Sequence, residues 1–329
     1  MPTPGTGSKT PVVALVGPTA SGKSAIAVVL AKRLSAEIVS ADSMQVYRYM
    51  DIGTAKPSEE ERGGVPHHLI DVALPGERFS AAMYRRLADT AVSSISRRGR
   101  LPMLVGGTGL YVRSVLDDYI FDDEGTADPD LRQELEELGR HEGGEALHAK
   151  LRKVDPAAAS RIHPNDLRRV IRALEVFMST GTPISKLQGK APGTRPRYKS
   201  IMVGLTRSRP KLYEAIDSRV DEMMRRGLVD EVRSLQEAGY GEGLTSAQAL
   251  GYKEIVLYLK GLSCLDEAVR LIKRDTRRYA KRQLTWFRRD RRITWFDRDA
   301  HPDEEALISG MAGHIDRELG MSPAARSDV

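Results

Sequence analysis

Hydrophobic runs of about five residues alternate with stretches of helical spacing in the first third of the chain. Apolar positions dominate 12–16 and recur in a strand-like run at 37–41, with a helical pattern at 24–34 between them. A third apolar run covers 101–105 and leads into several glycines. Strands that alternate with helices predict a parallel sheet covered on both faces, which is an α/β fold.

A helix is predicted between the second and third apolar runs. Ser80 is a candidate cap for its first turn, and Gly99 marks its end. Residues at a four-residue spacing form its predicted core-facing stripe: Met83, Leu87, Ala91 and Ile95.

The pattern changes near Asp117, where acidic residues precede segments of helical spacing without a strand pattern until about Tyr198. Within them, Asn165 is a candidate helix cap and Gly181 a candidate helix end. We interpret 120–196 as a helical insertion. The apolar face of its clearest helix consists of Leu167, Val170, Ile171, Leu174 and Phe177.

The chain then returns to the sheet. A strand-like run covers 200–206, helices are predicted from there to Arg289, and a last possible strand covers 293–296. Only the two ends, 1–10 and 316–329, have the composition of disordered tails. The predicted domains are a core of 11–119 and 197–315 and an insertion of 120–196.

Composition places the chain among globular proteins. Its 329 residues are 40% hydrophobic and 29% charged, enough for a sizeable core and two structural units. Cys264 is the only cysteine, so neither an internal disulfide nor a cysteine-rich zinc site is expected, and a reducing cytoplasm is predicted. No window approaches the roughly 18 apolar residues of a membrane span, and 1–10 lack an apolar signal core, so neither secretion nor membrane contact is expected.

Positive charge is concentrated in one segment. The net charge of the whole chain is +6, but the segment from Arg270 to Arg292 contains eleven basic and two acidic residues, which leaves the rest near −3. Such a patch favours a polyanionic partner, because phosphate contacts release counterions. A solvated helix face is the alternative, and charge alone does not choose between them.

A complete phosphate-binding motif follows the first predicted strand. Its glycines let backbone N–H groups surround phosphate oxygens, and the following helix N-terminus adds partial positive charge. Lys23 would neutralise a phosphate, and the Ser24 hydroxyl would bind Mg²⁺. Such P-loops are typical of kinases and NTPases that bind ATP or GTP, so the predicted core is P-loop NTPase-like. The G-x-x-x-x-G-K-[ST] motif comprises Gly17, Pro18, Thr19, Ala20, Ser21, Gly22, Lys23 and Ser24.

Polar residues follow the other predicted strands at the same edge. Asp42 ends the second strand, at the carboxyl edge where open α/β sheets bind ligands. It is a candidate Mg²⁺ ligand, general base or loop cap. Asp71 is a weaker candidate for the metal role. Thr108 follows the third strand and is expected at this edge, although a glycine run there is by itself typical of a turn.

The basic segment has a helical pattern from Leu265. Residues at a seven-residue spacing are predicted to face the core: Leu265, Ile272, Tyr279 and Trp286. The opposite side forms a basic ridge: Arg274, Arg278, Lys281 and Arg282. Arginines also oppose the apolar face of the insertion helix: Arg168, Arg169 and Arg172. Two separate elements would then contact one phosphate backbone.

Six blocks in order along the chain resemble the tRNA dimethylallyltransferase family, also called tRNA isopentenyltransferases. They extend over nearly everything except the two tails. The P-loop ends in Ser24 where many members have threonine, which keeps the hydroxyl, and the zinc finger of eukaryotic members is absent, so the resemblance is to the bacterial type. The blocks are GPTASGKS at 17–24, ADSMQVYRYMDIGTAKP at 41–57, VGGTGLY at 105–111, NDLRRVIRALEVF at 165–177, QALGYKE at 248–254 and AKRQLTWFRR at 280–289.

The resemblance implies transfer of a dimethylallyl group from dimethylallyl diphosphate to N6 of adenosine 37 in tRNA, with release of diphosphate. The P-loop would bind the diphosphate of the prenyl donor instead of ATP. The family pattern assigns the general base to Asp42 and diphosphate contacts to Thr19 and Arg219. Mg²⁺ would be the cofactor, with Ser24 as its ligand, and the protein is expected to be a monomer.

The resemblance also implies contacts to the tRNA anticodon stem-loop, with the acceptor base flipped out of its stack. The insertion would bind tRNA together with the core. The implied RNA contacts are Asp42, Ser43, Met44, Gln45, Thr108, Arg132, Arg168, Arg169, Arg172, Gln248, Gly251, Tyr252, Lys253, Lys281, Arg282, Gln283, Trp286 and Arg288.

Three alternatives stay open at this point. A relative that prenylates free adenine nucleotides would share the fold and donor, but its small acceptor would not need the insertion or the second basic surface. A P-loop kinase would place Asp42 on Mg²⁺ and ATP in the loop. A non-catalytic RNA-binding module would have no use for the intact Gly22, Lys23 and Ser24.

Overall fold

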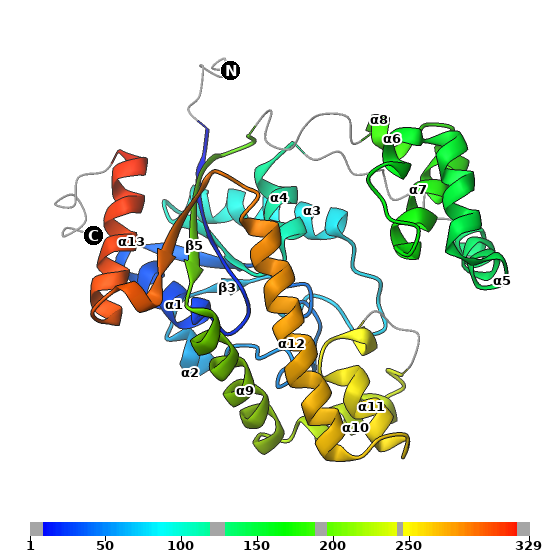
Figure 1. The fold of residues 1–329 in the computed structure, drawn as a ribbon. Helices are drawn as coiled ribbons and strands as arrows, with labels where there is room; N and C mark the ends of the chain where they lie inside the picture. The colour runs from blue at the N-terminus through cyan, green and yellow to red at the C-terminus, as the bar shows by residue number, and fades with distance from the viewer. Residues whose placement is uncertain (1–8, 119–128, 188–195, 242–245, 321–329) are drawn as a thin grey trace. The chain divides into compact units, whose positions relative to one another are not determined.

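The computed structural model describes residues 9–118, 129–187, 196–241 and 246–320 (Figure 1). The chain divides into two compact units. Unit 1 comprises 1–116 and 197–329, and unit 2 comprises 117–196. The predicted tail residues 1–8 and 321–329 lie outside the described residues.

Unit 1 is built on one six-stranded sheet in which all neighbouring strands are parallel, with the order β3-β2-β4-β1-β5-β6. The α/β fold and the five strands predicted from apolar runs are confirmed. β3 was not predicted, because it is two histidines long and has no apolar run. The strands are β1 Pro11–Val16, β2 Ala36–Ser40, β3 His67–His68, β4 Leu101–Gly106, β5 Lys199–Thr206 and β6 Ile293–Asp297.

Alternate residues of β1 enter two different cores. Val12, Ala14 and Val16 pack with α3, α4 and α12, whereas Val13 and Leu15 pack with α1 and α13. The strand is therefore buried on both faces, which explains its continuous apolar sequence. Helices cover both sides of the sheet in Figure 1. These are α1 Lys23–Arg33 and α13 Glu304–Leu319 on one face, and α3 Ala81–Arg97, α4 Gly109–Leu116 and α12 Leu265–Phe287 on the other.

The predicted stripe of α3 is confirmed at Ile95 and wrong by one position at its other three residues. Ser80 caps the helix as predicted, because its hydroxyl accepts from Met83 N at 3.1 Å. Leu87 is 40% exposed, however, and Tyr84 has a core position where its ring stacks on Tyr111 with 3.9 Å between centroids. The residues of α3 that are buried are Tyr84, Ala88, Val92 and Ile95.

The predicted disordered tail from 316 is also wrong in its first part. α13 continues to Leu319, and Met311 and Ile315 are fully buried against the sheet and α1. The remaining elements of unit 1 are α2 Glu59–Arg62, α9 Arg209–Arg225, α10 Leu228–Glu237, η2 Ser246–Gln248, α11 Tyr252–Leu259 and η3 Arg298–Ala300.

The described part of unit 2 is helical and has its own apolar core, which includes Leu147, Leu151 and Val170. The predicted cap at Asn165 is wrong, because Asp166 caps α7 by accepting from Arg169 N. The predicted end at Gly181 is confirmed by its left-handed φ of 69°. Residues 119–128 and 188–195 of the predicted insertion lie outside the described residues. The helices are α5 Pro129–Val154, α6 Pro156–Ala159, α7 Leu167–Thr180 and α8 Ile184–Leu187.

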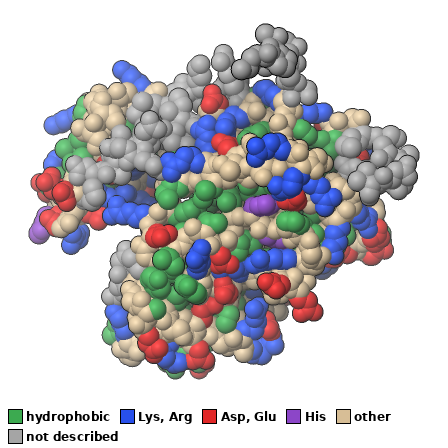
Figure 2. All heavy atoms as spheres, turned by 180° about the vertical axis from the view of Figure 1, so that it is seen from behind, with side chains coloured by type: hydrophobic (Ala, Val, Ile, Leu, Met, Phe, Trp, Pro, Cys, Tyr) green, Lys and Arg blue, Asp and Glu red, His purple; other side chains and the backbone are tan. Residues whose placement is uncertain are grey.

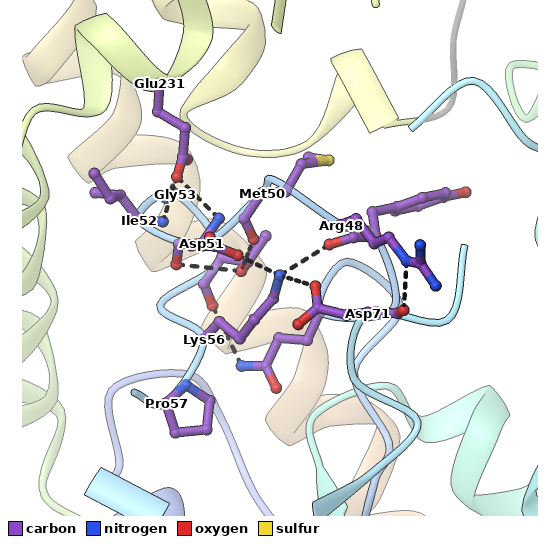
Figure 3. Close-up of polar contacts among 12 residues, drawn as sticks. Arg48, Met50, Asp51, Ile52, Gly53, Lys56, Pro57, Asp71 and Glu231 are labelled. Carbon is purple, nitrogen blue, oxygen red and sulfur yellow. Dashed lines mark hydrogen bonds and ion pairs between the residues drawn. The ribbon is translucent and has the colours of Figure 1, made fainter. Parts of the chain in front are cut away.

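Two charged side chains, the half-buried Glu231 and the buried Lys56, hold the segment that follows β2 (Figure 3). The Glu231 carboxylate of α10 accepts the backbone N–H groups of Asp51, Ile52 and Gly53 at 2.9, 2.7 and 3.1 Å. It also accepts the Tyr252 hydroxyl at 2.7 Å. A carboxylate with four donors replaces the water that these groups lose on folding.

Lys56 is the second of these side chains, and only 6% of the residue is exposed. Its ammonium group donates to Tyr47 O at 2.9 Å and Asp71 Oδ1 at 2.6 Å, and it forms an ion pair with Asp51. Gln45 donates to the carbonyls of the same segment, 3.3 Å from Ala55 O. The segment thereby supports the loop that begins at the end of β2.

We expect Glu231→Gln to lower the free energy of unfolding by about 1–3 kcal/mol, because an amide has one accepting oxygen where the four donors use both oxygens of the carboxylate. Urea unfolding measures this change. Glu237→Gln, at the exposed end of the same helix, is the matched control. Equal stability of the two variants would show that Glu231 does not hold the segment.

Candidate functional site

The P-loop connects β1 to α1 and bends at two glycines with positive φ. Gly17 has a φ of 149°, and a Cβ there would lie 2.3 Å from Leu205 O. Gly22 has a φ of 92° and precedes the first turn of α1. Only glycine meets both requirements without strain. The predicted strand, loop and helix around the motif are therefore present, and the N-terminus of α1 opens on the loop.

Three charged groups lie within electrostatic reach of one another at this edge. Burial and, to a smaller extent, the Arg219 charge lower the pKa of Lys23 to about 7, although the Asp42 charge acts in the opposite direction. Burial also lowers the pKa of Arg219, against the raising effect of Asp42. Lys23 donates to Pro18 O at 2.5 Å. Two desolvated cations with one carboxylate favour an anionic ligand of more than one charge.

The half-buried Asp42 closes a turn at the end of β2. Its Oδ1 accepts Met44 N at 2.9 Å and Gln45 N at 3.4 Å. Among the described residues, no hydrogen bond to Oδ2 is found. The loop-cap role and a chemical role are thus compatible, because they use different oxygens of one carboxylate.

The loop after β4 is packed directly onto this turn. A Cβ on Gly106 would lie 2.1 Å from Ala41 O, which only glycine tolerates. Thr108 Oγ1 accepts Ser43 N at 3.0 Å and donates to Ser43 Oγ at 3.3 Å. Thr108 therefore lies at the sheet edge expected for it, beside Asp42. Asp71, the weaker metal candidate, is instead paired with Lys56.

The α12 helix contacts the same loops with two of its side chains. The Gln283 amide is 6% exposed; it accepts Thr19 N at 2.8 Å and donates to Gly107 O at 3.0 Å. Trp286 lies against Gly109, where a Cβ would be 2.1 Å from the indole ring.

The predicted seven-residue core repeat of α12 is correct in its middle and wrong at its ends. Ile272 is buried, and Tyr279 is half-buried. Leu265 in the first turn is 36% exposed, and Trp286 is 37% exposed because it lies at the sheet edge rather than beneath it.

Most basic residues of α12 already have acidic partners. Arg270 pairs with Glu267, Lys273 with Asp221, Arg277 with Asp217, and both Arg274 and Arg278 with Asp275. Acidic and basic side chains are likewise interspersed on the face seen in Figure 2. Within the part of the chain that the structure describes, five residues of the basic segment form no ion pair: Lys281, Arg282, Arg288, Arg289 and Arg291.

The remaining implied RNA contacts differ in exposure. Tyr252 is 2% exposed, and Gly251 is buried, whereas Gln248 and Lys253 are exposed. The other four implied contacts lie in unit 2. Three have acidic neighbours on their own helix or at its cap: Arg132 with Glu136, Arg169 with Asp166 and Arg172 with Glu175. The fourth, Arg168, is exposed.

The donor set fits a magnesium ion that a diphosphate brings with it. Ser24 lies exposed in the first turn of α1. Residues 9–118, 129–187, 196–241 and 246–320 contain no cluster of three His, Cys, Asp or Glu side chains that could bind a metal. A hydroxyl, phosphate oxygens and water are the ligands that Mg²⁺ accepts where the protein supplies no carboxylate cage.

Sequence reasoning missed the aromatic pair beside this site. Tyr84 and Tyr111 are stacked and buried, and burial raises the pKa of both hydroxyls, to which the Asp42 charge adds. Tyr111 belongs to the quoted VGGTGLY block, but Tyr84 lies on a helix whose apolar stripe was assigned one residue away. Counting tyrosine as apolar would have found it.

A parallel sheet with helices on both faces, and a glycine-rich loop with charged groups at its carboxyl edge, defines an α/β protein whose candidate ligand site lies at that edge. The described residues include no helix with the length and apolar character needed to cross a membrane.

Comparison with known proteins specifies the family. The family model described as IPP transferase matches residues 45–290. A tRNA dimethylallyltransferase of Moorella thermoacetica is 52% identical over 321 residues, 96% of this chain and 98% of that protein. One of Carboxydothermus hydrogenoformans is 54% identical over 281 residues, 85% of this chain and 90% of that protein. The chain belongs to the IPP transferase family, and the resemblance drawn from the six blocks is confirmed.

Solved structures of tRNA-modifying transferases are similar to this chain in both sequence and fold. The full-length tRNA isopentenylpyrophosphate transferase of Bacillus halodurans is 48% identical, with a TM-score of 0.69, and the match covers 95% of this chain and 98% of that one. A eukaryotic dimethylallyltransferase acting on tRNA is 28% identical, with a TM-score of 0.79, over 95% of this chain and 80% of that one.

The lowered pKa of Lys23 predicts that pyrophosphate binding takes up a proton above pH 7. A bound anion raises the pKa again, so affinity should fall by up to about tenfold per pH unit between the free and bound pKa values. Calorimetry at pH 8 in buffers of different ionisation enthalpy counts the protons. Lys23→Arg stays charged and controls for protons taken up by pyrophosphate itself. Equal uptake by both proteins would contradict the assignment.

Proposed function

We propose that this protein transfers the dimethylallyl group of dimethylallyl diphosphate to N6 of adenosine 37 in tRNA and releases diphosphate. Membership of the IPP transferase family and the names of its relatives support the reaction. The observation that carries the proposal is the placement of Lys23 and Arg219 beside Asp42 at the P-loop.

Each of these residues has a step to perform. The allylic carbon–oxygen bond breaks, negative charge accumulates on the departing diphosphate, and the cations of Lys23 and Arg219 with the N-terminus of α1 stabilise it. The carbon forms its new bond to N6, which gives up a proton. Asp42 accepts that proton on Oδ2, because Oδ1 is occupied by the turn.

Mg²⁺ bound to diphosphate oxygens and Ser24 would supply further charge stabilisation of the leaving group. The kinase alternative needs ATP in the same loop, and the proposal needs none. The cytoplasmic location and the monomeric state stay predictions.

The RNA partner is supported by unpaired positive charge. Arg270 and the other basic residues as far as Arg278 have acidic partners. By contrast, Lys281, Arg282 and Arg288 are exposed and form no ion pair among the described residues. A partner of high negative charge gives these cations a role that a small nucleotide does not. We therefore place the RNA backbone along the C-terminal half of α12.

The deciding experiment incubates the protein, Mg²⁺ and dimethylallyl diphosphate with unmodified tRNA or with adenosine monophosphate, followed by mass spectrometry of the nucleosides. Prenylated adenosine 37 in tRNA alone is expected. Product from the monophosphate alone would indicate the free-nucleotide reaction. ATP turnover without prenyl transfer would indicate a kinase.

Asp42→Ala should lower kcat by about 10² or more, as expected for loss of a general base, and leave the tRNA Kd within about threefold. Single-turnover kinetics with saturating donor measures the first quantity, and filter binding the second. Asp51→Ala removes a carboxylate from the same connecting segment, beyond the Asp42 turn, and is the control for local disturbance. Undiminished turnover in Asp42→Ala would remove this residue from the mechanism.

Replacing Lys281 and Arg282 by Gln should weaken tRNA binding and reduce the slope of log K against log salt by about 1.5, because each lost phosphate contact contributes about 0.7–0.9. Arg270→Gln is the matched control on the same helix, since its charge is already used by Glu267 at 2.6 and 2.7 Å. A slope unchanged from wild type would make this part of α12 ordinary solvated surface.

A further inference from the structure

One residue that the family pattern associates with RNA is buried in the diphosphate site. Gln283 is 6% exposed, and both ends of its amide are used within the protein. Oε1 accepts the backbone N–H of Thr19 at 2.8 Å, and Nε2 donates to the backbone carbonyl of Gly107 at 3.0 Å. Little of this amide is therefore accessible to an RNA base.

The backbone is shaped to fit the Gln283 amide both at Gly107 and at the P-loop. A Cβ on Gly107 would lie 2.1 Å from Gln283 Nε2, so only glycine at 107 leaves room for the amide. On the other side, the amide meets the third residue of the P-loop, in a loop already bent by Gly17 and Gly22. Gln283 therefore joins the P-loop to the loop after β4, two segments that are far apart in sequence.

The same face of α12 extends this connection toward Asp42. Tyr279 is one turn before Gln283, and its hydroxyl interacts with the side chains of Gln283 and Thr108. Thr108 in turn binds Ser43, the neighbour of Asp42. One helix face thus contacts both loops that carry the proposed chemistry, while Lys281 and Arg282 lie exposed.

We propose that Gln283 is a positioning residue of the diphosphate site and not an RNA contact: its amide fixes the Thr19 backbone relative to Gly107, and so sets the shape of the P-loop for the prenyl diphosphate. The proposal rests on the proposed function for the identity of the ligand. Its physical basis is that loss of the amide leaves the N–H of Thr19 and the carbonyl of Gly107 without their hydrogen-bond partners at a site with little access to water.

The test measures binding of inorganic pyrophosphate with Mg²⁺ by calorimetry, without RNA. Gln283→Met keeps the side-chain volume and removes both hydrogen bonds, and should weaken pyrophosphate binding by about 5- to 20-fold. The tRNA Kd should stay within about twofold, since no exposed charge is lost. In steady state, KM for dimethylallyl diphosphate should rise while KM for tRNA is unchanged. Gln236→Met on α10 controls for the substitution type.

The proposal would be overturned if Gln283→Met weakened tRNA binding and left pyrophosphate binding unchanged. Gln283 would then be an RNA contact. Should Gln283→Met fail to fold, Gln283→Glu provides the second variant. It can still accept from Thr19 N but cannot donate to Gly107 O, and should also weaken pyrophosphate binding, whereas unchanged binding contradicts the proposal. A wild-type protein that binds pyrophosphate but prenylates nothing would disprove the proposed function and leave the Gln283 test valid.

Discussion

Two cations and one carboxylate, all three partly buried at the carboxyl edge of a parallel sheet, set the requirements for the rest of unit 1. Burial lowers the pKa of Lys23 to about 7 and also lowers that of Arg219, and Asp42 compensates only one of the two charges. Desolvated charge is unfavourable unless a partner replaces the lost water. The proposed diphosphate would be such a partner, and it requires the surrounding loops to keep these three groups in place before it binds.

The loops are held by close backbone approach and by a few buried polar side chains. Gly106 allows the end of β4 to touch Ala41, and Gln283 joins the adjoining Gly107 to the P-loop. In the segment that follows the Asp42 turn, Glu231 accepts the N–H of Asp51 and Lys56 donates to the carbonyl of Tyr47. Except for those of Lys56, these contacts join segments distant in sequence, so the shape of the site depends on the tertiary fold.

The difference between local and distant constraints explains what the sequence could predict. Strands such as β1 were recognisable because a parallel sheet buries both faces and leaves an uninterrupted apolar run. The P-loop was recognisable because its backbone geometry requires glycine at fixed positions. The two-residue β3, the core position of Tyr84 and the burial of Gln283 depend on neighbours that no local pattern reveals. The Asn165 cap failed for a smaller reason, since Asp166 beside it is an equally good cap.

The basic segment shows why charge counted along a sequence overstates a binding surface. Its eleven basic residues suggested one continuous ridge, yet the first half of α12 places Arg270, Lys273 and Arg277 within reach of carboxylates on α12 and α9. Ion pairs of this kind contribute little to stability but remove charge from any distant field. Among the described residues of this segment, the positive charge that remains unpaired lies at the exposed C-terminal end of the helix, near Lys281 and Arg288. Because Gln283 at that same end contacts the P-loop, the two surfaces proposed for the RNA and for the prenyl donor lie on one helix.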